Sequence, residues 1–162
     1  MPDSHSPYQA QPIRVLLVED NPGDSDMIRD RLDASRLWLE FFVVEDGVRA
    51  GDFLARRAPY EQAPRPDLIL LDLNLPRRNG WEVLAQIKGD ENLRRIPVVV
   101  LTSSDVERDI ALSYEHGANA YITKPVDFEG FVRVVNAVEH FWFTIVRLPP
   151  HLDPPPVIPA GA

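Results

Sequence analysis

Four side chains that could do chemistry together each follow a short apolar run. Glu19 and Asp20 are consecutive, Asp72 lies in the middle of the chain, and Lys124 lies near its end. The runs before them are residues 14–18, 68–71 and 121–123. Such runs, rich in β-branched residues and bounded by polar residues, predict strands buried on both faces. Because parallel strands bring their C-terminal ends to one edge of a sheet, the three carboxylates and the lysine should meet there.

Crowded carboxylates indicate a cation and a group-transfer reaction. They resist joint ionisation unless a cation joins them. A hard divalent ion such as Mg²⁺, which prefers oxygen ligands, meets that need. A carboxylate beside such an ion and a lysine can accept a phosphoryl group. The residue types therefore predict phosphoryl transfer onto Asp72, with Glu19 and Asp20 as metal-binding acids and Lys124 as a point charge on the phosphoryl group.

A hydroxyl joins this group, and each member also has a simpler interpretation. Thr102 follows the apolar run 98–101 and could bond a phosphoryl oxygen at the same edge. Taken singly, Thr102 could be an ordinary strand-end residue, Lys124 a solvated lysine, and the acids polar turn residues. The joint placement of all five at matching strand ends favours the functional interpretation. The Lys124–Pro125 bond could be cis, which would fix the direction of the lysine.

Strands and helices alternate along the chain. We expect strands at 14–18, 39–44, 68–71, 97–101 and 120–123. We expect the first helix to begin at an Asn21 cap followed by Pro22. Further helices are expected at 48–57, at 81–88 and at 128–146, and another from a Ser104 or Asp105 cap to residue 115. Asp24 lies in the first turn of the first helix, where an acid interacts favourably with the helix dipole, and Gly117 should end the fourth helix. The pattern predicts an α/β fold with a parallel sheet and helices on both faces.

Composition limits the class of protein. The chain has 162 residues, which predicts one domain, and a formal net charge of -8, which argues against a nucleic-acid partner. It has no cysteine, and its four histidines show no zinc-like spacing. No apolar run approaches the ~18 residues of a membrane span, so a cytoplasmic location is the default. We expect a disordered leader at 1–12, a folded domain at 13–148 and a proline-rich tail at 149–162.

Four segments closely resemble the receiver domains of bacterial two-component response regulators. They are Leu17–Asn21, Leu70–Pro76, Leu101–Ser103 and Tyr121–Pro125. The resemblance covers residues 13–146 and keeps the family's order and spacing. It implies a flavodoxin-like (βα)5 fold with a five-stranded parallel sheet of order 2-1-3-4-5. It also implies phosphorylation of Asp72 by a phosphohistidine of a sensor histidine kinase.

The resemblance assigns further roles to single residues. Mg²⁺ would be held by Asp20, Asp72 and the backbone carbonyl of Asn74, with Glu19 ligating through water. The acid pair is Glu-Asp here, where many members have Asp-Asp, and this common variation leaves the metal site intact.

The same resemblance assigns the switch and the phosphoryl lifetime. Thr102 and Tyr121 would form the switch pair, and Lys124 would be the family's lysine. Asn74 and Ser104 would flank the path of the hydrolytic water and tune the phosphoryl lifetime.

Other segments resemble the small stand-alone regulators that partner bacterial phytochromes. These are Asn21–Asp24, the proline-rich loop before Leu68, Arg94–Pro97 and Phe141–Pro149. The kinase could then be a bacteriophytochrome. Since no DNA-binding output domain is expected, the output would be protein contact or onward transfer to a downstream phosphotransfer protein.

The last helix has apolar residues on more than one face. One stripe toward the sheet would contain Phe128, Phe131, Val132, Val135, Val138, Trp142 and Ile145. Val134, Phe141 and Leu148 form a second stripe, and Phe143 points elsewhere again. A helix apolar on several faces covers something besides its own core, which predicts a homodimer. The alternative is that the proline-rich tail folds back over these residues.

Two other functions compete with the phosphorylated switch. One is a receiver-fold module that binds partners without phosphorylation, although such modules usually lose an acid or the lysine. The other is a phosphatase with Asp72 as nucleophile, which would need a second aspartate two residues later, where this chain has Asn74. We therefore expect a protein that catalyses only its own phosphorylation and dephosphorylation.

Overall fold

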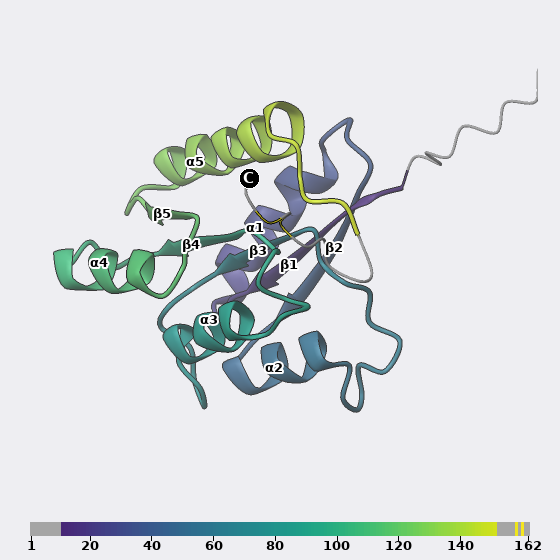
Figure 1. Ribbon diagram of the computed structural model, residues 1–162. Coiled ribbons are helices and arrows are strands. Elements are labelled where there is room, and N and C mark those ends of the chain that lie inside the picture. Colours follow the sequence, from purple (N-terminus) through teal and green to yellow (C-terminus); the bar gives the residue numbers. More distant parts are fainter. Residues whose placement is uncertain (1–10, 152–157, 159, 161–162) are drawn as a thin grey trace, which may run out of the picture.

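One parallel sheet forms the centre of the molecule. The structure is a computed structural model that describes residues 11–151, 158 and 160. Its strands are β1 (Ile13–Val18), β2 (Leu39–Val44), β3 (Leu68–Leu71), β4 (Val98–Thr102) and β5 (Ala120–Thr123). They pair in parallel in the order β2-β1-β3-β4-β5 (Figure 1). The order and direction of the strands confirm the predicted flavodoxin-like fold.

Helices cover both faces of this sheet. They are α1 (Pro22–Asp33), α2 (Gly47–Ala55), α3 (Gly80–Gly89), α4 (Glu107–Glu115) and α5 (Phe128–His140), followed by one π-helical segment, η1 (Phe141–Ile145). Helices α2 and α3 lie on one face and α1 and α5 on the other, while α4 lies beside the edge strand β5 (Figure 1).

The core has two layers because successive strand residues point to opposite faces. On β1, Leu16 and Val18 pack toward α2 and α3, whereas Val15 and Leu17 pack toward α1 and α5. All four side chains are buried. A strand covered on both sides needs apolar residues at every position, which explains the uninterrupted runs in the sequence.

Among the five α-helices, all but α4 begin at a side-chain cap. Asn21 accepts a hydrogen bond from the Asp24 backbone at 3.0 Å, as predicted. The expected Ser104 or Asp105 cap is wrong, because α4 begins at Glu107 after Val106, which makes no capping bond. The hydroxyl of Ser104 instead donates to Asp109 at 2.6 Å.

Two backbone features near the strand ends bear on the site. The Lys124–Pro125 bond is trans, and the cis bond in the described chain joins Ala58 to Pro59. Gly80 opens α3 against β3, where a Cβ would lie 2.4 Å from the Asp72 carbonyl oxygen. Glycine at this position therefore lets α3 start directly beside the backbone of Asp72.

The predicted helix stop at Gly117 is confirmed by its φ of 98°.

The end of the last helix differs from the prediction of one helix through residue 146. A π turn holds more residues than an α turn, so η1 shifts the following side chains around the axis. Phe143, which we expected at a dimer interface, is 7% exposed and packs in the chain's own core. Phe128 and Ile145, which we expected to face the sheet, are exposed.

After η1 the chain runs to the edge of the sheet where the strands begin. His151 Nε2 lies 2.6 Å from Asp67 Oδ1, just before β3. Phe141 stays 49% exposed, so residues 146–151 do not cover it. The rest of the proposed tail, apart from 158 and 160, and residues 1–10 of the proposed leader lie outside the described residues. Within the part of the chain that is described, no helix is both long and apolar enough to cross a membrane.

Candidate functional site

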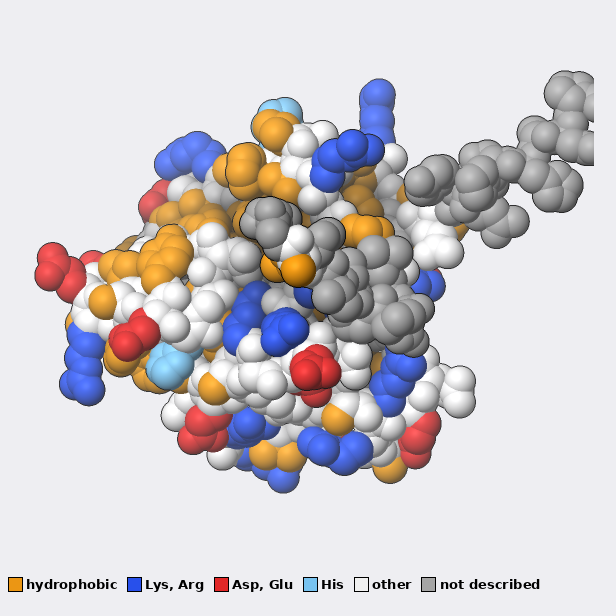
Figure 2. Space-filling model, viewed as in Figure 1, with side chains coloured by type: hydrophobic (Ala, Val, Ile, Leu, Met, Phe, Trp, Pro, Cys, Tyr) orange, Lys and Arg blue, Asp and Glu red, His pale blue; other side chains and the backbone are white. Residues whose placement is uncertain are grey.

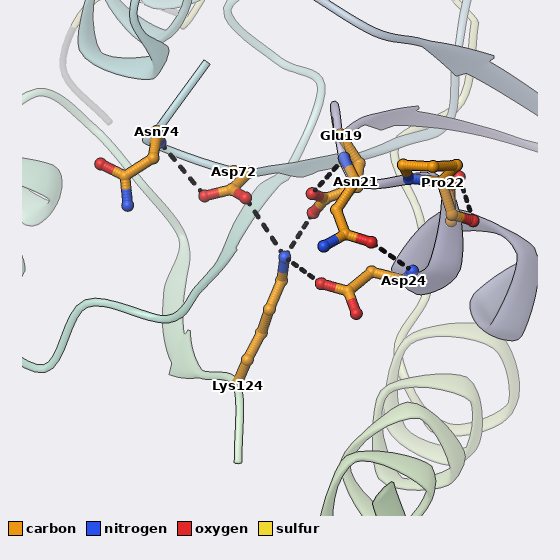
Figure 3. Close-up of polar contacts among 8 residues, drawn as sticks. Glu19, Asn21, Pro22, Asp24, Asp72, Asn74 and Lys124 are labelled. Carbon is orange, nitrogen blue, oxygen red and sulfur yellow. Dashed lines mark hydrogen bonds and ion pairs between the residues drawn. The ribbon is translucent and has the colours of Figure 1, made fainter. Parts of the chain in front are cut away.

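The predicted side chains meet at the C-terminal edge of the sheet. Glu19 and Asp20 follow β1, Asp72 follows β3, Thr102 ends β4 and Lys124 follows β5. Strand order alone puts the ends of β1, β3, β4 and β5 next to one another. Figure 3 shows Lys124 pointing into the space between Glu19, Asp24 and Asp72.

Lys124 is the centre of a nearly buried ion-pair network. Its Nζ lies 2.5 Å from Glu19 Oε2, 3.0 Å from Asp24 Oδ2 and 3.2 Å from Asp72 Oδ2 (Figure 3). Three acids around one ammonium leave an excess of negative charge at this edge. Since a buried, unpaired carboxylate is costly, the network has room for a second positive charge.

Burial and ion pairing change the pKa values of Glu19 and Lys124. The pKa of Glu19 rises to about 7, chiefly because burial disfavours its charged form, and the charge of Asp72 acts in the same direction. The hydrogen bond from Lys124 opposes this rise. Burial alone would lower the pKa of Lys124, but its hydrogen bond to Glu19 and the charge of Asp72 raise it above the ordinary value. Lys124 therefore stays charged across the neutral range.

Three carboxylates at this edge can converge on one ion. Glu19, Asp20 and Asp72 each offer an oxygen, and these oxygens lie within 4.8 Å of one another. Asp20 is exposed to solvent, whereas Glu19 and Asp72 are buried at 2% and 6% exposure. An all-oxygen donor set with one solvent-facing member fits a hard divalent cation that keeps part of its water shell. The residues present therefore fit Mg²⁺.

Both oxygens of Asp72 have partners. Oδ2 faces Lys124, and Oδ1 accepts a hydrogen bond from the Asn74 backbone at 3.2 Å. These contacts hold the carboxylate in one orientation at the end of β3. The Asn74 side chain is exposed, so it lies where solvent approaches Asp72.

Thr102 carries a buried hydroxyl whose hydrogen-bonding capacity is unused. The residue is 0% exposed, and its Oγ1 has no hydrogen-bond partner among the described residues. Its backbone carbonyl accepts from the Lys124 backbone at 2.7 Å, which ties the ends of β4 and β5 together. An unsatisfied buried hydroxyl is costly, and this one lies at the end of β4, on the edge of the sheet that carries Asp72.

Tyr121 connects β5 to the loop between β4 and α4. Its hydroxyl donates to the Ser104 carbonyl oxygen at 2.8 Å. Burial raises the pKa of Tyr121, and the charges of Asp109, Asp105 and Asp72 raise it further. The Ser104 side chain is engaged with Asp109, so in this structure its hydroxyl points toward α4.

Sequence reasoning missed one member of the network. Asp24 was assigned to the helix dipole, yet its carboxylate pairs with Lys124. The available signal was spacing, because Asp24 lies four residues after Asp20 and so about one helical turn along. The capped start at Asn21 fixes that turn against the site.

Sequence comparison places this arrangement in a known family. The family described as response regulator receiver domain matches residues 15–136, which is most of the chain. The response regulator Rcp1 of Synechocystis sp. is 46% identical over 135 residues, covering 83% of this chain and 92% of Rcp1. The chain belongs to the response regulator receiver domain family.

Solved structures of this family agree with the receiver fold. The Mn²⁺-bound form of Rcp1 matches with a TM-score of 0.84 at 45% identity, covering 86% of this chain and 100% of the other. The phosphorylated cyanobacterial phytochrome response regulator RcpA matches with a TM-score of 0.84 at 44% identity and the same coverage. This receiver domain is thus a two-component signalling protein whose relatives include phytochrome response regulators.

Proposed function

We propose that this receiver domain takes a phosphoryl group onto Asp72 from a phosphohistidine of a sensor histidine kinase. The observation that carries the proposal is the convergence of Lys124 on Glu19, Asp24 and Asp72, beside the unsatisfied hydroxyl of Thr102. The network concentrates negative charge around one nucleophile and keeps one cation in contact with it.

Each side chain has a part in the transfer. An oxygen of Asp72 forms a bond to phosphorus, the bond from phosphorus to the imidazole nitrogen breaks, and the imidazole keeps the electron pair and takes up a proton. Lys124 stays charged and stabilises the negative charge on the phosphoryl oxygens. The Asn74 backbone holds Asp72 in position during the attack.

The proposed cofactor is Mg²⁺. Asp20, Asp72 and the backbone carbonyl of Asn74 would hold the ion, and Glu19 would hold it through water. When bound, it supplies positive charge that offsets the repulsion between the carboxylates and the incoming phosphoryl oxygens. The donor set of three convergent carboxylates supports this assignment.

The switch would operate through Thr102 and Tyr121. A phosphoryl oxygen on Asp72 gives the Thr102 hydroxyl the acceptor that it lacks. Movement of Thr102 disturbs the following loop, whose Ser104 carbonyl holds Tyr121. The phosphoryl group thereby shifts a two-state equilibrium at the β4–α4 loop and β5. Asn74 and Ser104 would tune the lifetime of the phosphorylated state.

Partners and location complete the proposal. The similarity to RcpA and Rcp1 supports a phytochrome-type sensor kinase as the phosphoryl donor. The exposed apolar residues Phe141 and Ile145 of η1 support a homodimer. Val134, which packs partly against the core, and Leu148 would take part with Phe141, and buried Phe143 would not. A downstream phosphotransfer protein remains part of the proposal, as does a cytoplasmic location. The protein would catalyse only its own phosphorylation and dephosphorylation.

The proposal is tested by intact mass after incubation with acetyl phosphate or phosphoramidate. We expect a gain of one phosphoryl group that needs Mg²⁺ and disappears in Asp72→Asn. Asp67→Asn, which changes a carboxylate at the opposite edge of the sheet, should still be phosphorylated. No gain from either donor or from a panel of phytochrome kinases would instead favour a module that acts without phosphorylation.

A further inference from the structure

All the N–H donors of the Lys124 side chain are engaged. A lysine ammonium carries three donors, and the Lys124 Nζ contacts one oxygen from each of three acids, which are Glu19, Asp24 and Asp72. Acidic and basic side chains are interspersed on the face of the molecule shown in Figure 2, whereas here three acids surround one base. A phosphoryl oxygen must therefore compete with one of these acids for an N–H of Lys124.

Two of the three acids change partners in the proposed reaction, and Asp24 does not. Glu19 and Asp72 belong, with Asp20, to the set of carboxylates that can converge on a metal ion. Asp72 also takes the phosphoryl group. Asp24 lies outside the convergent set. Asp24 therefore keeps its negative charge beside Lys124 when the other two acids are engaged.

One residue, Asn21, orients both Glu19 and Asp24. Its backbone N–H donates to Glu19 Oε1 at 3.1 Å, and its Oδ1 accepts from the Asp24 backbone at 3.0 Å (Figure 3). Pro22 opens α1, and a Cβ at Gly23 would lie 3.2 Å from Asn21 Oδ1, so glycine leaves room for the cap. The start of α1 thus fixes the backbone from which the Asp24 carboxylate reaches the lysine.

Asp24 is also the acid of this network that has the most contact with water. Its side chain is 30% exposed, compared with 2% for Glu19 and 7% for Asp72. A carboxylate that stays hydrated keeps its charge at little cost, whereas a fully buried one needs a partner. Asp24 can therefore hold the ammonium or release it without a large loss of stability.

We propose that Asp24 is a positioning residue that competes with the phosphoryl oxygens for Lys124 and so limits the stability of the phosphorylated state. This role rests on the proposed function, in which Lys124 stabilises the phosphoryl group on Asp72. Asp24 acts through the lysine. Its negative charge has two opposite effects, because it attracts a cation to the carboxylate edge and repels the anionic phosphoryl group.

Asp24→Asn separates these effects, because asparagine has nearly the same shape without the charge. Beryllium trifluoride is the probe for the phosphoryl group, since this anion binds a carboxylate oxygen and presents fluorides in place of phosphoryl oxygens. We expect the variant to bind Mg²⁺ about two- to fivefold more weakly, as measured by calorimetry. At saturating Mg²⁺ it should bind beryllium trifluoride about two- to fivefold more tightly by fluorine NMR, as expected for loss of a partly exposed ion pair. The Lys124 Nζ resonance should also shift.

Asp26→Asn is the matched control. Asp26 is an exposed acid two residues further along α1, about 200° around the helix from Asp24. Its substitution removes the same charge from the helix without changing a partner of Lys124. Both affinities should stay within about twofold of the wild type, which is the scale of a surface charge. The Lys124 Nζ resonance should not move.

The signs of the two changes decide the outcome. Weaker binding of both Mg²⁺ and beryllium trifluoride by Asp24→Asn would show that Asp24 only supports the shape of the site, and this would overturn the inference. Unchanged affinities, or the same changes in Asp26→Asn, would overturn it as well. A wild type that binds Mg²⁺ but takes neither beryllium trifluoride nor a phosphoryl group would overturn the proposed function itself, and this role with it. Circular dichroism of both variants confirms that the fold is retained.

Discussion

The Thr102 hydroxyl is buried at the site without a hydrogen-bond partner in the described chain. Such a group lowers stability, because it loses its bonds to water and gains none from the protein. A phosphoryl oxygen on Asp72 would supply the acceptor. Under the proposed function, Thr102 would lower stability in the unphosphorylated state in exchange for a hydrogen bond formed only after phosphorylation.

Replacing Thr102 by valine tests this trade. Valine keeps the shape and removes the hydroxyl, so we expect the unphosphorylated variant to be unchanged or more stable by up to about 1 kcal/mol in urea unfolding. The phosphorylated wild type should be stabilised relative to its unphosphorylated form by more than the variant is. A loss of more than about 1 kcal/mol in the unphosphorylated variant would mean that the hydroxyl already has a role there.

Glu19 makes stability depend on pH. The folded protein keeps the Glu19 proton up to a pKa of about 7, whereas the unfolded chain releases it near 4.5. Between these values the folded state binds more protons, so the free energy of unfolding falls as pH rises. Relative to Glu19→Gln, we expect the metal-free wild type to lose stability between pH 5 and 8, by at most about 3 kcal/mol.

The measurement is urea unfolding of both proteins across this pH range, in EDTA and in Mg²⁺. Mg²⁺ favours the carboxylate form and should reduce the fall, because it adds a positive charge beside Glu19. Parallel pH profiles for wild type and Glu19→Gln in EDTA would show that the carboxyl group is ionised throughout.

At the scale of the element, the change from α5 to η1 decides which aromatic residues enter the core. In a continuous α-helix, Val135, Val138 and Trp142 would continue one buried stripe. The π turn adds residues to the last turn, so Phe143 is buried and Phe141 is left on the surface.

Two alanine substitutions measure this change of register. Phe143→Ala should lower the free energy of unfolding by about 3 kcal/mol or more, because it leaves a cavity beside α5. Phe141→Ala, its matched control at 49% exposure, should cost less than about 1 kcal/mol. Both values come from urea unfolding of the two variants. The reverse ranking would mean that the helix continues without the π turn.

The sequence was sufficient to predict the elements that depend on local pattern. β2, β3 and β5 were predicted with the residues that the structure assigns, because their apolar runs end at clear polar stops. The start of α1 followed from Asn21 and Pro22. The meeting of Asp72 with Lys124 followed from their positions after apolar runs, because parallel strands end at the same edge of a sheet. The strand order came from resemblance to a family, since local pattern does not determine which strands pair.

Side-chain contacts in space were harder to predict. Asp24 fitted a helix-dipole role, and its contact with Lys124 could be inferred only from its spacing of four residues from Asp20. The predicted start of α4 was wrong because the Ser104 hydroxyl donates to Asp109 instead of capping the helix. Arg56, Arg65 and Arg95 lie far apart in the sequence, and only the fold brings them to the lining of one hollow beside the end of α2.

At the scale of the whole molecule, the two edges of the sheet carry different side chains. The C-terminal edge gathers carboxylates around Lys124, whereas a hollow at the opposite edge has Arg56, Arg65 and Arg95 in its lining. The exposed apolar residues of η1 form a third surface, away from both edges.

This third surface determines the expected assembly. Phe141 and Ile145 are 49% and 58% exposed, and their burial against a second chain would remove apolar area from water. Each chain carries a formal charge of -8, so two chains repel at long range and salt should strengthen the dimer by screening that repulsion. We therefore expect sedimentation equilibrium at micromolar concentration to show a dimer whose dissociation constant falls as salt is added.

Charged substitutions on this surface should separate the chains without unfolding them. Phe141→Glu and Ile145→Glu should each raise the dissociation constant by about tenfold or more, because each places a charge in an apolar contact. Trp38→Glu, at a site with 61% exposure outside α5 and η1, is the matched control and should leave the dimer intact. A wild-type monomer at every salt concentration, or equal weakening by Trp38→Glu, would exclude η1 as the interface.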